Sequence, residues 1–403
     1  MLAPRQRSRL PTHTHTHTHT QRTNPTMNML LILSPIRSLA PALALAALAV
    51  PGLARTGASG NTQSKNDVVK LKNGTEEPGR IKSEEYGGLA FDPEKGTART
   101  IPWNEIAQIT YQNGEDMEAA RDLLNQGKLD EAVSQFANLL KPEAKLRGLL
   151  KQHVLFANAT ALNRLGKPDE AVEAYKALLK EFPKSRYLPE VAEGLVSAHG
   201  AKNDLEGAKK ALEELNTGAV TAGVEQNFSA VVAIQRGRIL ERQEKWSEAF
   251  SAYNAALTTS GVTALASQQA RLGQGRCQVK QKKLSEAESL FRKISGEDAP
   301  NPILAGAWNG LGDLAQAEGR EKRDAAVLLD ALLMYLRGVV QYGPLPGEST
   351  YEYERALAGA AECFNNLSQV ESNKELKARY ARSRDERKAQ LQKEFPNSPF
   401  LPK

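Results

Sequence analysis

Histidines are the residues of this chain that could most readily bind a metal, and four of the six lie close together. They alternate with threonine in residues 12–20, and in an extended chain they would share one side and could hold a metal loosely. The same alternation is typical of low-complexity sequence, or of a translation start placed upstream of the true one. His153 and His199 lie far apart in the sequence. We therefore predict no metal site and no cofactor.

The chain lacks the common sequence motifs of catalysis. The chain has no HExxH, GxSxG, P-loop or CxxC pattern. LGQGRC (272–277) has spaced glycines but lies in a predicted helix rather than after a strand, so we interpret the glycines as a packing feature and not a phosphate loop. Cys277 and Cys363 fall in predicted helices, where we expect small buried apolar residues. We predict that the chain is not an enzyme. A cell-wall-processing enzyme, which would need a carboxylate pair in a closed pocket, is a less favoured alternative.

The basic balance of the whole chain, +6 at pH 7, comes mainly from its beginning. Residues 1–54 carry five arginines and no acidic residue, so the remainder is close to neutral. A neutral body gives little electrostatic attraction for a polyanion. We predict protein or peptide partners and no nucleic acid.

The first 66 residues read as a leader and a linker. After the low-complexity residues 1–26, we interpret residues 27–54 as a signal peptide, because Arg37 precedes an apolar run that ends in small residues. Cleavage is expected after Ala54 or Ala58, followed by a linker over 55–66. The expected location is periplasmic or secreted. In the alternative, an uncleaved leader anchors the chain in the inner membrane, and the leader is then its only membrane contact.

Residues 67–112 predict a small all-β module. Short stretches rich in β-branched residues are separated by glycine turns, of which Asn73-Gly74 is the clearest hairpin signal. About five short strands would form a small barrel-like sheet that packs on the first helices. LKNG (71–74) and IPWNEIAQITY (101–111) resemble SH3-like or Sm-like barrels. We expect Trp103 and Tyr111 to be core or junction residues rather than a ligand platform.

A helical pattern recurs from residue 115 to 403. A small residue is followed twelve positions later by alanine and then, four positions on, by an aromatic residue. The small residue and the alanine would let two helix axes approach closely, while the aromatic ring fills the gap against the neighbouring hairpin. The copies are Ala120/Ala132/Phe136, Ala159/Ala171/Tyr175, Gly237/Ala249/Tyr253 and Gly275/Ala287/Phe291.

This order of residues resembles the tetratricopeptide repeat (TPR), and Trp308 and Gly312 lie at first-helix positions of a further copy. The alanine-to-alanine step of 37 to 41 residues is longer than usual, the third copy has Leu212 instead of an aromatic, and GREKRDAAVLLD is inserted before Ala331. KEFPKSRYLP (180–189) and KEFPNSPFLP (393–402) resemble repeat ends of bacterial envelope TPR proteins. The predicted fold is mainly α: a TPR-like α-solenoid of helical hairpins preceded by the β module.

Cationic residues beside the small position are expected to point toward the concave face of such a solenoid. They could grip an acidic segment or a C-terminal carboxylate, although an ordinary solvated charged face is the simpler interpretation. These residues are Arg164, Arg238, Arg242, Arg276 and Lys280. The predicted function is an exported, non-enzymatic scaffold for envelope assembly or secretion that binds envelope proteins. The alternative is a membrane-anchored structural subunit of an envelope complex.

Overall fold

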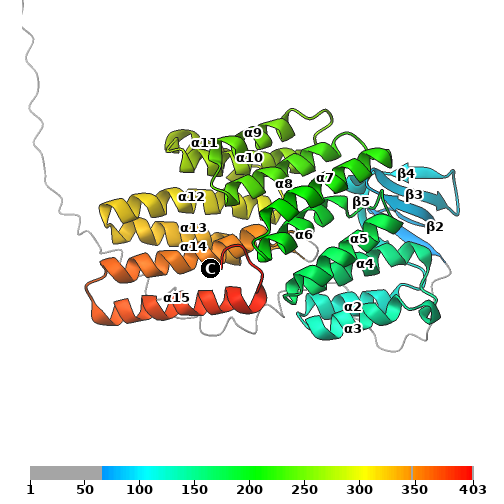
Figure 1. Cartoon of the computed structure of the whole chain (residues 1–403), viewed down its shortest axis with the longest axis horizontal. Coiled ribbons are helices and arrows are strands. Elements are labelled where there is room, and N and C mark those ends of the chain that lie inside the picture. Colours follow the sequence, from blue (N-terminus) through cyan, green and yellow to red (C-terminus); the bar gives the residue numbers. More distant parts are fainter. Residues whose placement is uncertain (1–65, 346–347, 402–403) are drawn as a thin grey trace, which may run out of the picture. The chain divides into compact units, whose positions relative to one another are not determined.

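The structure is a computed structural model that describes residues 66–345 and 348–401. The expected architecture is confirmed: a five-stranded antiparallel sheet precedes fourteen α-helices within the described residues. Helices follow one another as antiparallel pairs from α2 to α15 (Figure 1). The predicted leader and most of the predicted linker lie outside the described residues.

The sheet is a meander whose last strand returns to the first. Its order is β4-β3-β2-β1-β5, so β1 pairs with β2 on one side and with β5 on the other. Asn73-Gly74 forms the expected first turn, and Gly74 has φ of +89°, which glycine adopts without strain. The elements are β1 (Asp67–Leu71), β2 (Glu76–Glu85), β3 (Gly88–Pro93), β4 (Arg99–Ile101), the 3₁₀ helix η3 (Trp103–Glu105) and β5 (Ile106–Thr110).

The sheet shares one hydrophobic core with the first helices, as its small size requires. Val69, Leu89 and Phe91 are fully or almost fully buried and pack in the same cluster as Met117 and Leu150. The sheet therefore has no separate core of its own.

The helices form hairpins with short turns. Their bounds are α2 (Glu115–Asn125), α3 (Leu129–Leu139), α4 (Gly148–Arg164), α5 (Pro168–Glu181), α6 (Leu188–Ala201), α7 (Leu205–Thr221), α8 (Phe228–Arg242), α9 (Trp246–Leu257), α10 (Ala264–Lys280), α11 (Leu284–Ser295), α12 (Asn301–Lys322), α13 (Ala325–Val340), α14 (Tyr351–Val370) and α15 (Lys374–Glu394). A short 3₁₀ helix, η4 (Pro142–Ala144), precedes α4. The first helices of successive hairpins, α2 to α14 by even numbers, contact one another in order.

The same turn closes the first six hairpins. One residue has positive φ, and the next residue's N–H bonds back to a carbonyl in the last turn of the first helix, as in Lys128 N to Leu123 O at 2.9 Å. Glycine, which adopts positive φ without strain, occupies this position in two of the hairpins. The six residues are Gly127, Gly166, Asn203, Glu244, Lys282 and Arg323.

The inserted segment before Ala331 lengthens a helix rather than forming a loop. α12 spans 22 residues and α13 begins at Ala325, so most of GREKRDAAVLLD is helical. Among the described residues, none of the helices combines the length and the apolar character needed to cross a bilayer.

Candidate functional site

Two aromatic residues of the repeat pattern, Tyr253 and Phe291, each lie between glycines of two neighbouring first helices. The Tyr253 ring lies against Gly237 of its own hairpin and Gly273 of the next, where an added Cβ would come within 2.7 and 2.3 Å of the ring. Phe291 lies in the same way between Gly275 and Gly310. Side chains larger than hydrogen at these glycines would separate the helices.

The other predicted repeat positions are also at helix contacts. Ala132, Ala159, Ala171, Ala249 and Ala287 are fully buried. The Gly312 Cα faces the Tyr335 ring, and Trp308 is covered by the guanidinium of Arg337, 4.1 Å from its ring centroid. Sequence reasoning missed Gly273, Gly310 and Gly359, which contact Tyr253, Phe291 and Tyr335, because each belongs to the hairpin after that of its ring.

Arg238 and Arg276, two of the five predicted cationic residues, are buried against the chain's own α14. Arg276 donates to both Glu241 oxygens at 3.1 Å and to Glu352 Oε1 at 3.0 Å. Arg238 pairs with Glu193 at 3.0 Å, and its guanidinium lies 4.6 Å from the Tyr351 ring centroid.

The remaining members extend this cluster across five first helices, α6, α8, α10, α12 and α14. Glu352 also accepts from Asn309 and Arg355 at 3.1 Å, and Arg355 pairs in turn with Asp313. Burial alone would raise the pKa of Glu352, but Arg355 and Arg276 hold it below its usual value. We call this set the α14 network: Glu193, Arg238, Glu241, Arg276, Asn309, Asp313, Glu352 and Arg355.

The other three predicted cationic residues point elsewhere. Arg164 donates to the Leu124 carbonyl at 3.2 Å, and Arg242 donates to the Gly200 carbonyl at 2.9 Å. Both thus satisfy carbonyls at the C-terminal end of the preceding first helix. Lys280 is exposed, and its ammonium lies 5.6 Å from the Trp246 ring centroid. The five residues therefore do not form one solvent-facing patch.

The segment before α14 and the last described residues contact two earlier first helices, α6 and α4. Ser349 donates to Glu193 of α6, and the Asn397 side chain donates to the Asn163 carbonyl of α4. Glu354 of α14 is buried close to Ser398 and Glu193. Burial and the nearby Glu193 carboxylate raise its pKa to about 7, against the opposing effects of hydrogen bonds from Thr350 and Ser398.

A second buried polar cluster joins the sheet to the helices. The Glu84 carboxylate, with a fully buried side chain, contacts His153 Nε2 and accepts from Tyr111 at 2.7 Å, Arg186 at 3.2 Å and Gln152 at 3.3 Å. Burial alone would raise its pKa, yet His153 and Arg186 hold it below the usual value. We call Glu84, Tyr111, Gln152, His153 and Arg186 the sheet network.

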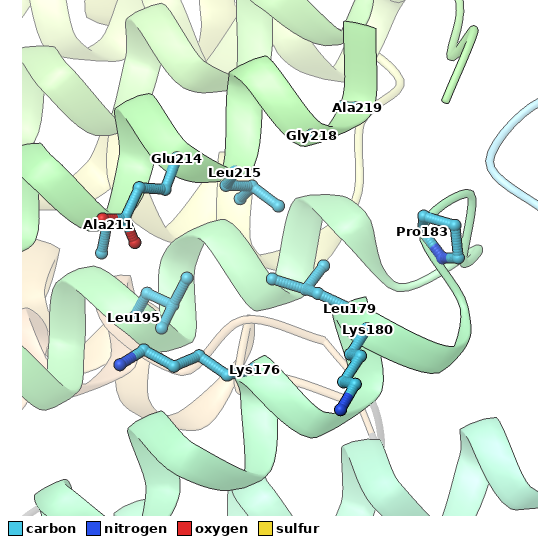
Figure 2. Close-up of a pocket in the computed structure, with 10 residues that line it drawn as sticks. All are labelled: Lys176, Leu179, Lys180, Pro183, Leu195, Ala211, Glu214, Leu215, Gly218 and Ala219. Carbon is cyan, nitrogen blue, oxygen red and sulfur yellow. The ribbon is translucent and has the colours of Figure 1, made fainter. Parts of the chain in front are cut away.

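One apolar groove opens between second helices, on a different set of elements from the predicted cationic residues. α5 and α7 form its walls and Leu195 of α6 its floor, as Figure 2 shows. Its volume is about 290 Å³. It is lined by Lys176, Leu179, Lys180, Pro183, Leu195, Ala211, Glu214, Leu215, Gly218 and Ala219. We call it the α5–α7 groove. The one sequence signal near it was the missing aromatic at Leu212 of α7.

The remaining expectations concern the two cysteines and metal binding. Cys277 and Cys363 are free and buried, and burial raises the pKa of both thiols. Within the described ranges, no group of three or more His, Cys, Asp or Glu side chains is arranged to hold a metal ion. The histidine-rich residues 12–20 lie outside those ranges.

Three solved structures similar to this chain illustrate the likeness. A tetratricopeptide repeat protein from Parabacteroides merdae is 20% identical, with 67% of this chain and 98% of that chain covered and a TM-score of 0.37. PilW, a widely conserved type IV pilus biogenesis factor, is 18% identical, with 62% and 96% covered and a TM-score of 0.35. The C-terminal part of a TPR repeat-containing protein from Cytophaga hutchinsonii is 15% identical, with 64% and 97% covered and a TM-score of 0.35.

The family comparison is more direct. None of the curated proteins matches this sequence. The tetratricopeptide repeat model matches residues 117–186, 156–215 and 234–302. These segments contain the hairpins in which the alanine and aromatic positions lie at helix contacts. The hairpins within residues 117–215 and 234–302 of this chain are therefore tetratricopeptide repeats.

Proposed function

We propose that this chain is an exported, non-enzymatic scaffold that binds proteins in the cell envelope. Tetratricopeptide repeats mediate protein–protein interactions by presenting extended surfaces made from stacked hairpins. The observation that carries the proposal is the series of hairpins from α2 to α15, whose first helices contact one another in order and in which Tyr253, Phe291 and Tyr335 pack on glycines of neighbouring first helices. The proposed export rests on the sequence of residues 27–54.

The structure limits where such a scaffold can hold a partner. Arg238 and Arg276 are buried by α14, so a partner could use them only after α14 moved away. Surfaces formed by second helices need no such rearrangement. Partner binding by the five cationic residues stays a prediction. Because α14 covers Arg238 and Arg276, we expect partners to bind on the second helices instead.

Cell fractionation with in-cell cross-linking tests the proposal. The full chain with a C-terminal tag should be recovered from the envelope or periplasmic fraction, with Arg55 or Ser59 as its first residue. Photo-cross-linking side chains placed on exposed second-helix positions should give discrete protein adducts. A chain that stays in the cytoplasm with its leader intact and gives no adducts would contradict the proposal. Recovery in the membrane with the leader retained would support the anchored alternative.

A further inference from the structure

The α5–α7 groove is an apolar depression that opens directly onto the hydrophobic core. Leu195 at its floor and Leu215 on its wall are almost fully buried and belong to the core cluster of hairpins α4 to α8. α7 contributes small residues, and a Cβ added at Gly218 would meet no atom within 4 Å. The groove therefore exists because α7 carries small residues where a larger side chain would fit.

The size and lining of the groove indicate what could fill it. An apolar cavity of about 150 Å³ can hold one benzene molecule, and this groove has a volume of about 290 Å³. It thus has room for two large apolar side chains. Two such side chains separated by one turn of a partner helix lie on the same face of that helix.

Charges at the rim give the occupant an orientation. Lys176 and Lys180 lie one turn apart on the α5 rim, whereas Glu214 lies on the α7 rim (Figure 2). Within the described part of the chain, the one carboxylate paired with Lys176 is that of the exposed Glu173, and such a surface ion pair contributes little. Among the described residues, no carboxylate pairs with the Lys180 ammonium. The α5 rim is therefore cationic and the α7 rim is not.

We propose that the α5–α7 groove binds an amphipathic helical segment of a partner protein. The segment inserts two large apolar side chains, such as leucine or phenylalanine, and turns acidic residues toward Lys176 and Lys180 of α5. This inference rests on the proposed scaffold function and names the site and the chemistry of its partner.

Selection of displayed peptides tests the groove directly. A random library of 16-residue peptides is selected on the immobilised full chain, and the enriched peptides are synthesised for titration. We expect them to share two apolar anchors spaced for a helix, with Asp or Glu on one flank. Selection of peptides without apolar anchors, of peptides with basic flanks, or of no peptide at all would overturn the proposal.

A filling variant locates the binding site. Gly218→Leu places a side chain in the groove, and it should preserve folding because the space is open and leucine is the better helix former. It should weaken binding of the selected peptides at least tenfold. Gly148→Leu is the matched control, since Gly148 is also helical with no atom within 4 Å of an added Cβ, and binding should be unchanged. Equal binding by Gly218→Leu and the wild type would refute the site.

Charge reversal tests the orientation. Lys176→Glu combined with Lys180→Glu should weaken acidic peptides at least tenfold and strengthen versions with lysine in place of the acids. The same changes at exposed Lys374 and Lys377 of α15 should have no effect. Equal losses from the two double variants would show that only overall charge matters, and the proposed orientation would be wrong.

Failure of the groove and failure of the scaffold give different results. If envelope proteins cross-link to the chain and Gly218→Leu keeps every adduct, the groove inference fails while the scaffold stands. If the leader is unprocessed and no adducts form, the scaffold fails regardless of the peptides. If Gly218→Leu turns a wild-type dimer into a monomer, the occupant is a second copy of this chain and the proposed partner is wrong.

Discussion

The sheet network and the α14 network both bury charge between distant parts of the chain, but they distribute it differently. In the sheet network one carboxylate, Glu84, is the acceptor for donors from β5's C-terminal side, α4 and the loop before α6. In the α14 network carboxylates and guanidinium groups alternate, so that Arg276 has both Glu241 and Glu352 as partners.

This difference sets how each region responds to the loss of one group. A buried donor left without its acceptor keeps its desolvation cost, and a buried charge left alone is costlier still. Removing Glu84 leaves every member of the sheet network short of its shared acceptor. Removing Glu352 leaves Arg276 with Glu241 and leaves Arg355 with Asp313. The sheet network should be the more fragile of the two.

The largest effect is expected at Glu84. Glu84→Ala should lower the free energy of unfolding by about 3–5 kcal/mol, the usual cost of breaking a buried ion pair. Urea unfolding of the full chain, followed by circular dichroism, measures it. Glu105→Ala, at an exposed position in η3, is the control and should change little. A cost for Glu84→Ala as small as that of the control would break the comparison.

Glu352→Ala should cost less, about 1–3 kcal/mol, because each arginine keeps a second carboxylate. The same urea titration provides the value. A triple variant with Glu352, Glu241 and Asp313 all changed to alanine sharpens the comparison. It removes both carboxylate partners of Arg276 and of Arg355, and it should lower the free energy of unfolding by more than the three single variants together. If Glu352→Ala lowered the free energy of unfolding as much as Glu84→Ala does, the second carboxylates would not compensate for the missing one.

Glu354, beside the α14 network, should make stability depend on pH. Its pKa in the folded chain is raised to about 7 from 4.5, so the folded state holds a proton that the unfolded state releases earlier. Its contribution is fully present below pH 4.5 and is lost as pH rises through 7. Glu354→Gln should match the wild type at pH 4.5 and be more stable by about 1–3 kcal/mol at pH 8.5. Urea titrations at both pH values test this, and a constant difference would contradict it.

The smallest effect is expected at Ser349, which donates one hydrogen bond to Glu193. Arg238 still pairs with Glu193 when the hydroxyl is removed. Ser349→Ala should therefore cost about 0.5–1.5 kcal/mol or less. Arg238→Met, which removes the charged partner instead, is the companion variant. If Ser349→Ala lowered the free energy of unfolding more than Arg238→Met, the contact at Glu193 would depend on the serine hydroxyl rather than on the ion pair with Arg238.

Sequence alone predicted what is local or periodic. The helical hairpins and the alanine and aromatic positions all follow from spacing within one hairpin. In two of the turns the positive φ is adopted without strain by glycines, Gly127 and Gly166. Glu244 and Lys282 adopt the same positive φ as those glycines, and nothing in their side chains indicates it. In these turns the packing of the two helices overrides the local preference of the residue.

Contacts between segments far apart in the sequence could not be predicted from the spacing within one hairpin. Arg276 and Glu352 are 76 residues apart, and Glu84 and His153 are 69 apart. Whether an arginine on a first helix meets solvent or α14 depends on how several hairpins stack, and no single-repeat pattern carries that information. The α5–α7 groove likewise depends on the separation of two helices rather than on a motif.

The bond from Asn397 to the carbonyl of Asn163 has a consequence for how the chain comes apart. In a linear array each unit touches only its neighbours, so such arrays can melt stepwise from their free ends. Here the last described segment is fastened to the second hairpin. The last described segment cannot detach without breaking its contact with α4, so the helices from α4 onward should lose their structure in one cooperative event.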